Sequence, residues 1–235
     1  LKFIKDKISD DASSDIRTIT FNLYNNLGIM LTSDYQSQIK NFNSENKILL
    51  SKLGIRIGAK YFFISNFLKK NSMELKALLW KIYNNFEEVE KYPLPNDGRV
   101  LFTPEFKMPD SYWFAIGYIK INNLAVRVDV FEKVFYLARQ KIKSGPFIQS
   151  SELLNPIGCN SQQLATILLF CGFDNITIGE EIRLFFLKQN NSKKNNVIKI
   201  KTKKASKKII KTIHKERKKK ETDPNSPFAV LQKLL

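Results

Sequence analysis

The side chains that could do acid–base or metal chemistry are few and scattered. Two carboxylates close together could hold a metal ion for a nuclease, and the candidates are Asp97, Glu105, Asp110, Asp129 and Glu132. Asp129 and Glu132, however, have the three-residue spacing of a capping box, in which both serve the start of a helix. The other three lie in a stretch whose prolines predict a loop. We therefore predict no catalytic residue and no metal site.

Histidine and cysteine add no further catalytic material. The one histidine, His214, lies within a run of lysines, so Ser-His-Asp, Cys-His and histidine–metal sites all lack a member in a folded position. Cys159 and Cys171 belong to no CxxC pair. We predict two buried thiols, no disulfide, and a reducing, cytoplasmic setting.

Nucleotide-binding loops are not found in the sequence either. The nine glycines form neither GxxxxGK[ST] nor GxGxxG, and the pair Gly54 and Gly58 lacks the spacing that binds phosphate. The chain by itself is therefore predicted to hydrolyse no nucleotide and to hold no cofactor.

Basic side chains are the chemistry that the sequence does supply. The formal net charge is +17, and residues 191–222 carry 14 lysines and arginines against two acidic residues. This segment has no aromatic residue and few large apolar ones, which predicts a disordered, lysine-rich tail over residues 189–222. Such a tail binds nucleic-acid phosphates without sequence preference. The alternative interpretation is a solubilising linker or a general binder of acidic surfaces.

The residues predicted to bind nucleic acid fall into two groups. Arg56 and Lys60 lie beside a glycine-bounded strand, and Lys69 and Lys70 follow it. The second group belongs to the tail: Lys193, Lys194, Lys199, Lys201, Lys203, Lys204, Lys207, Lys208, Lys211, Lys215, Arg217, Lys218, Lys219 and Lys220.

Helices are expected to position the first group. Residues 1–90 read as a mainly helical subdomain, with a short strand pair within residues 54–64. Four prolines within residues 91–111 predict a linker after it. Before that linker, five apolar residues recur at helical spacing and predict one buried helix face: Leu75, Leu78, Leu79, Ile82 and Phe86.

Residues 112–188 are predicted to form a winged-helix-like unit. Its expected elements are strands at 112–121 and 124–128, a helix from Asp129, a short helix at 150–154, a second helix opened by Asn160 and Gln163, and a closing strand pair around Gly179. The helix that would enter a DNA groove, residues 160–171, contains no lysine or arginine, so packing against protein is favoured over sequence-specific DNA recognition. The fold class is predicted to be mainly α with small β elements, an α+β fold.

The last residues predict a short amphipathic docking helix over 223–235. Ser226 can cap it, and Phe228, Leu231 and Leu235 share one face. A helix of this length persists only when it is docked, on this chain or on a partner protein. No apolar run approaches the roughly 20 residues of a membrane span, so no membrane partner is expected.

Five blocks follow one another along the chain: Leu53-Gly-Ile-Arg-Ile-Gly58; Leu75-Lys-Ala-Leu-Leu-Trp80; Ala125-Val-Arg-Val-Asp129 with Glu132; Gly158-Cys159 with Leu164-Ala165 and Gly172-Phe173; and Asp223-Pro-Asn-Ser-Pro-Phe-Ala-Val-Leu231. Together they resemble the C-terminal region of alphaproteobacterial superfamily-2 helicases, relatives of the mitochondrial degradosome RNA helicase. The resemblance covers most of the chain, and none of the blocks is a catalytic signature. Asn225 stands where that family usually has aspartate.

The resemblance implies a parent protein that unwinds nucleic acid, RNA rather than DNA, with ATP and magnesium bound in motor domains N-terminal to Leu1. The absence of a methionine at position 1 fits such a fragment. The leading hypothesis is therefore a non-catalytic, nucleic-acid-binding accessory region of an ATP-dependent helicase, in contact with its motor domains. The alternative is a stand-alone basic interaction module whose C-terminal peptide docks on a protein partner, and a small metal-dependent nuclease is the third.

Overall fold

The structure is a computed structural model that describes residues 13–86, 93–96, 98–105, 108–178 and 182–187. By their contacts, all of these residues belong to one compact unit. Within these ranges, no helix has both the length and the apolar character that crossing a membrane requires. The predicted tail at 189–222 and the predicted docking helix at 223–235 lie outside the described residues.

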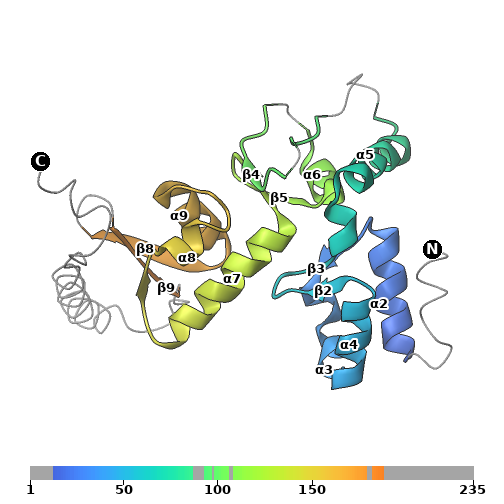
Figure 1. Cartoon of the computed structure of the whole chain (residues 1–235), viewed down its shortest axis with the longest axis horizontal. Coiled ribbons are helices and arrows are strands. Elements are labelled where there is room, and N and C mark those ends of the chain that lie inside the picture. The colour runs from blue at the N-terminus through green and yellow to red at the C-terminus, as the bar shows by residue number, and fades with distance from the viewer. Residues whose placement is uncertain (1–12, 87–92, 97, 106–107, 179–181, 188–235) are drawn as a thin grey trace, which may run out of the picture. The chain divides into compact units, whose positions relative to one another are not determined.

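Three modules of helices around a small sheet follow one another along the described chain (Figure 1). Module 1, residues 14–64, contains α2 (Ser14–Asn25), β1 (Ile29–Leu31), η1 (Thr32–Tyr35), α3 (Gln36–Lys40), α4 (Ser44–Lys52), β2 (Ile55–Ile57) and β3 (Tyr61–Ile64). After η2 (Ser65–Leu68), module 2, residues 70–127, contains α5 (Lys70–Asn84), β4 (Leu101–Phe102), α6 (Asp110–Ile116), β5 (Tyr118–Ile121) and β6 (Leu124–Arg127). Module 3, residues 128–187, contains α7 (Val128–Lys143), β7 (Phe147–Ile148), α8 (Ser151–Leu154), α9 (Ser161–Phe170), β8 (Phe173–Ile178) and β9 (Ile182–Leu187).

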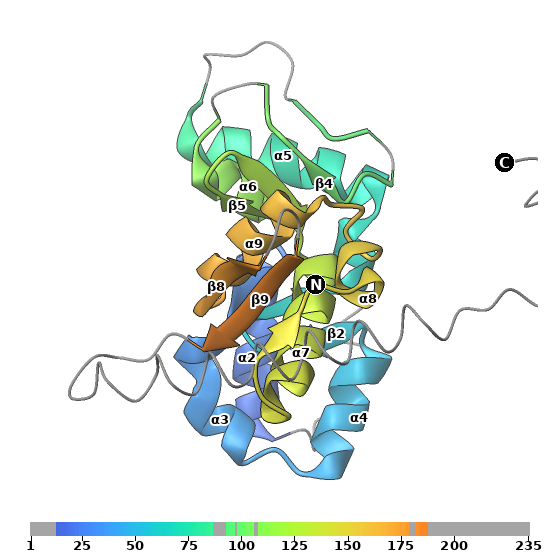
Figure 2. The same ribbon diagram turned by 90° about the vertical axis from the view of Figure 1, so that its left-hand side faces the viewer.

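The three modules share one sheet topology. Each sheet is antiparallel and three-stranded, and the last strand in sequence lies between the first and the second. Modules 1 and 3 run α-helix, strand, two α-helices and two strands, which is the element order of a winged-helix unit, and module 1 adds the short 3-10 helix η1 after its first strand. In module 3, α9 packs against β8 (Figure 2). The prediction of a mainly α fold with small β elements is confirmed. The winged-helix order, expected over 112–188, is found over 128–187 and again over 14–64.

Apolar spacing explains the helix that opens module 1. Ile16, Ile19 and Leu23 recur at helical spacing and are fully buried. Gly28, at φ +82°, lies in the left-handed region just after this helix. Behind α2, a single apolar cluster contains Leu50 of α4 and Phe62 of β3, so the helices of module 1 pack against the sheet.

The strand predicted over residues 112–121 is only half correct. Residues 110–116 form α6, because Tyr112, Trp113 and Ile116 follow helical spacing and are buried together. Gly117, at φ +98°, ends this helix in the left-handed conformation, and the strand begins one residue later. Aromatic residues favour strands in general, but packing against α5 decides the outcome here (Figure 2).

The helix predicted near residues 72–86 forms, but it buries the opposite face. Met73, Lys76, Ala77 and Trp80 are the buried residues of α5. The four residues predicted to be buried at 75, 78, 79 and 82 are instead exposed, and Phe86 alone packs partly against the core. The physical reason is the partner of the helix: Trp80 meets Tyr112 of α6 edge-to-face, with ring centroids 5.3 Å apart, and that contact fixes the rotation of α5.

Part of the proline-rich stretch predicted to be a linker is a strand. Leu101 and Phe102 form β4 and pair with Val126 and Ala125 of β6. The strand pair predicted within residues 54–64 is present as β2 and β3, and it gains a third strand, β1, that the sequence analysis did not predict.

Candidate nucleic-acid interface

A buried carboxylate of α7 binds the turn between β2 and β3. Oε2 of Glu132 accepts a hydrogen bond from the backbone N–H of Ala59 at 2.6 Å, and Oε1 accepts from the N–H groups of Lys60 and Tyr61, both at 2.8 Å. Three consecutive N–H groups that point at one anion form a small backbone nest. Glu132 therefore fixes the turn of module 1 to the first helix of module 3.

Glycine at position 58 makes this approach possible. A Cβ on Gly58 would lie 2.3 Å from the carboxyl carbon of Glu132, which is far inside van der Waals contact. The other side of the turn is held by Thr32, whose hydroxyl donates to the Gly58 carbonyl at 3.1 Å and whose N–H donates to the Lys60 carbonyl at 2.8 Å. The turn is thus hydrogen-bonded on two sides.

The prediction that Asp129 and Glu132 form a capping box is wrong. α7 begins at Val128 with Arg127 as its N-cap residue, and no side chain caps it. Asp129 instead forms a two-bond ion pair with the guanidinium of Arg127, at 2.7 and 2.9 Å. Glu132 is turned away from its own helix because the nest at residues 59–61 offers it three donors.

The buried charge of Glu132 also affects its surroundings. Burial raises the pKa of Glu132, while the three backbone hydrogen bonds and the nearby Lys60 act in the opposite direction. Burial, together with the negative charge of Glu132, raises the pKa of Tyr61 to about 12. The Tyr61 phenol therefore stays protonated at physiological pH.

A groove of about 430 Å³ opens between this turn and α7. Its floor is the rigid turn, and its borders carry one exposed cation from each side, Arg56 of β2 and Lys133 of α7. An aromatic ring, Tyr136, stands at its edge with 58% of its surface exposed. The lining residues are Arg56, Ile57, Gly58, Ala59, Phe63, Ser65, Asp129, Glu132, Lys133 and Tyr136.

The two carboxylates of the groove are held by other groups of the protein. Asp129 is paired with Arg127, and both oxygens of Glu132 accept backbone N–H bonds. Arg56 donates one guanidinium hydrogen bond to the hydroxyl of Ser51 at 2.7 Å, which orients the side chain and leaves further N–H donors on the same group. The groove therefore carries the exposed side chains of Arg56, Lys133 and Tyr136.

The other predicted binding residues of the described part lie away from this groove. The ammonium of Lys60 donates to the Phe170 carbonyl at the end of α9, at 2.8 Å, and lies 4.3 Å from the centre of the Phe170 ring. Lys60 thus stabilises the C-terminal end of a helix. Lys69 and Lys70 are both exposed at the start of α5. The predicted contacts from Lys193 to Lys220, and the docking residues Phe228, Leu231 and Leu235, lie outside the described residues.

The polar residues at the start of α9 are engaged within the protein. Asn160 and Gln163 form a complete capping box, in which each side chain accepts from the backbone of the other at 2.8 and 3.0 Å. Gln162 accepts from the guanidinium of Arg183 on β9, which also donates to Asn175 at 3.1 Å. The side-chain oxygens of Asn160, Gln162 and Gln163 are thus all engaged within the protein.

Sequence reasoning missed Lys133 and Tyr136 as members of a site. A signal was present, because the two are three residues apart on α7 and therefore neighbours on one helix face, on the side away from the buried stripe. What the sequence could not supply was the opposing wall: Arg56 lies 77 positions before Lys133 in the chain.

The carboxylates and thiols of the described residues form no metal-binding cluster, and both thiols have raised pKa values. No group of three or more His, Cys, Asp or Glu side chains within them could hold a metal ion, and Asp110 pairs with Lys120 at 2.8 Å. Burial raises the pKa of the Cys159 thiol to about 11 and of the Cys171 thiol to about 12. Both thiols are therefore protonated, weak nucleophiles at neutral pH.

Comparison with known proteins gives this geometry no counterpart. No protein-family model matches the chain, and no curated protein and no solved structure matches it either.

Proposed function

We propose that this chain is a non-catalytic nucleic-acid-binding region, and that the groove between the β2–β3 turn and α7 binds a single-stranded nucleic acid. The observation that carries the proposal is that Arg56 and Lys133 lie on opposite borders of the groove, with the exposed Tyr136 beside them. Both carboxylates of the groove already bind other groups of the protein. Cations that track a backbone and aromatic rings that stack on bases are the two parts of a single-strand site.

Each of the three side chains has a distinct task in this proposal. Arg56 and Lys133 contact phosphates on either side of the groove, and Arg56 can do so with two parallel N–H groups. Tyr136 offers its face to an unstacked base. Phe63, which is 6% exposed in the groove wall, offers the bound nucleic-acid strand an apolar contact.

RNA is the first ligand to test, and the cationic tail would add to the grip of the groove. The resemblance of the ordered sequence blocks to the C-terminal region of superfamily-2 helicases supports a role beside an ATP-dependent motor. In this role the region holds the strand while ATP and magnesium act on the motor domains. Reading the genomic sequence upstream of the codon for Leu1 tests this part separately: a start codon without motor motifs would refute it.

The binding proposal is tested by fluorescence anisotropy with a labelled single-stranded oligouridine and the full chain. Arg56→Ala and Lys133→Ala should each weaken binding, and each should reduce the salt slope by about 0.7, the value for one phosphate contact on a single strand. Lys40→Ala is the matched control, because Lys40 is an exposed lysine at the end of α3 that does not line the groove.

Two further variants separate stacking from charge. Tyr136→Leu should weaken binding about 5-fold or more, since a stacked base contributes roughly 1 to 3 kcal/mol, while Tyr136→Phe should bind as the parent chain does. Removal of residues 191–222 should lower affinity and salt slope further. If the groove variants and the Lys40 control behave alike, the groove is not the binding site.

A further inference from the structure

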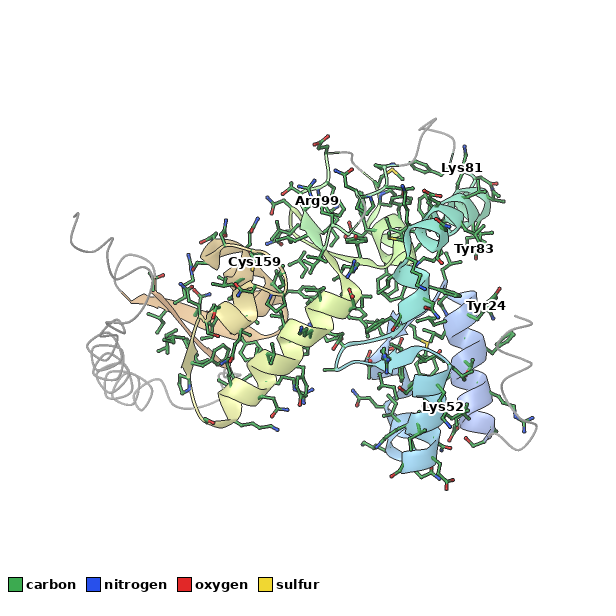
Figure 3. The ribbon with its side chains drawn as sticks, viewed as in Figure 1. Tyr24, Lys52, Lys81, Tyr83, Arg99 and Cys159 are labelled. Carbon is green, nitrogen blue, oxygen red and sulfur yellow. The ribbon has the colours of Figure 1, made fainter. Side chains whose placement is uncertain are left out.

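The outer side of α5 carries an exposed apolar surface, here called the α5 stripe and made of Leu75, Leu78, Leu79, Ile82 and Tyr83. Its members are between 43% and 87% exposed, and Tyr83 is the most exposed of them. The opposite side of the same helix is buried against α6. Tyr83 and the neighbouring Lys81 are labelled on this helix in Figure 3. The helix is therefore apolar on two faces, and one of them has no cover among the described residues.

The stripe is large enough to be an interface. Its exposed fractions add up to about three full side chains, which is on the order of 500 Å² for one copy. Two such surfaces laid together bury roughly 1,000 Å², the lower bound for a specific protein–protein contact. Isolated exposed leucines need no explanation, but five contiguous large apolar residues on one helix do.

The spacing of the stripe suits a second copy of the same helix. Leu75, Leu78 and Ile82 follow the three-four spacing of a two-helix seam. If two copies of α5 run antiparallel about a two-fold axis between positions 78 and 79, Leu78 of one copy lies opposite Leu79 of the other. Leu75 then lies opposite Ile82, so the stripe is complementary to itself, as a two-fold interface requires.

We propose that two copies of this chain associate through their α5 stripes, with the two helices antiparallel.

Sedimentation equilibrium of the full chain, freed of nucleic acid and measured in moderate salt, tests the proposal. An interface of this area predicts a monomer–dimer equilibrium with a dissociation constant of about 1 to 100 μM. Leu78→Glu should raise that constant at least tenfold. Ile48→Glu is the matched control, because Ile48 of α4 is also an exposed large apolar residue, 54% exposed, but lies outside the stripe; it should leave the constant unchanged.

Circular dichroism of each variant verifies that the helix content is kept. A chain that stays monomeric up to about 100 μM overturns the proposal, as does a dimer that Leu78→Glu leaves intact.

Discussion

The buried lysine of α5 gives the sharpest test of how module 2 is packed. Lys76 is only 4% exposed, and burial alone lowers its pKa from 10.5 to about 7. Its ammonium lies near Gly117, where an added Cβ would be 3.6 Å from Nζ. In the structure as described, no carboxylate forms an ion pair with it. Folding therefore takes a charged amine largely out of water, and burial disfavours its charged form.

The sign and size of the effect follow from proton linkage. Between pH 7 and pH 10.5 the unfolded chain holds a proton on Lys76 that the folded chain releases, so this residue makes the protein less stable as the pH falls through that window. The cost reaches its full size below pH 7; at pH 7 it is about 4 kcal/mol, and it falls by roughly 1 kcal/mol for each pH unit above that. At pH 9 about 2 kcal/mol remains.

Replacing Lys76 by methionine, which has a similar shape and no charge, should remove this cost. Urea unfolding at pH 7, 8 and 9 should show Lys76→Met to be more stable than the parent chain, with a difference that shrinks as the pH rises. Comparing two chains that share the same cysteines and tyrosines cancels the titration of those groups. Lys70→Met, at the exposed start of α5, should give a difference near zero at every pH. A Lys76→Met difference that stays constant from pH 7 to pH 9 would refute the reasoning.

Three further predictions concern single contacts and can be measured by the same urea unfolding at neutral pH. Glu132→Gln should destabilise the protein by about 2 kcal/mol, since an amide cannot accept all three N–H bonds and leaves a buried donor unpaired; an unchanged midpoint would show that the turn is held without it. Gly58→Ala should cost about 1 to 3 kcal/mol because the new methyl group displaces the Glu132 carboxylate, and its effect should largely vanish when Glu132→Gly is already present. Asn160→Ala should cost about 1 kcal/mol by removing the capping box of α9, whereas Asn160→Asp should retain most of the stability.

Local signals in the sequence were sufficient where structure is decided locally. The burial of Ile16, Ile19 and Leu23 follows from spacing alone, and the start of α9 follows from Asn160 and Gln163, whose hydrogen bonds close within four residues. The strand pair around residues 54–64 was predictable for the same reason, because its glycines and β-branched residues act on their neighbours.

The errors arise where two local signals compete and a distant contact decides. α5 carries two apolar stripes, and the one with more leucines is the exposed one, because Trp80 on the other face meets Tyr112. Glu132 stood three residues after Asp129, as in a capping box, but its partners lie more than 70 positions away. The groove was missed because it depends on a long-range contact. The sequence indicates the strand turn and the helix that form its two walls, but not that these two elements pack side by side.

The hydrogen bonds of Glu132 also bear on how the chain comes apart. The acceptor belongs to module 3 and the donors to module 1, so separating the two leaves either three bare N–H groups or an unpaired buried anion. Unfolding either module alone therefore costs the free energy of these unpaired polar groups. We expect the modules to unfold together in one cooperative transition rather than one after another. A protease that cuts the chain once between residues 93 and 111 should accordingly produce two fragments that remain associated until denaturant is added.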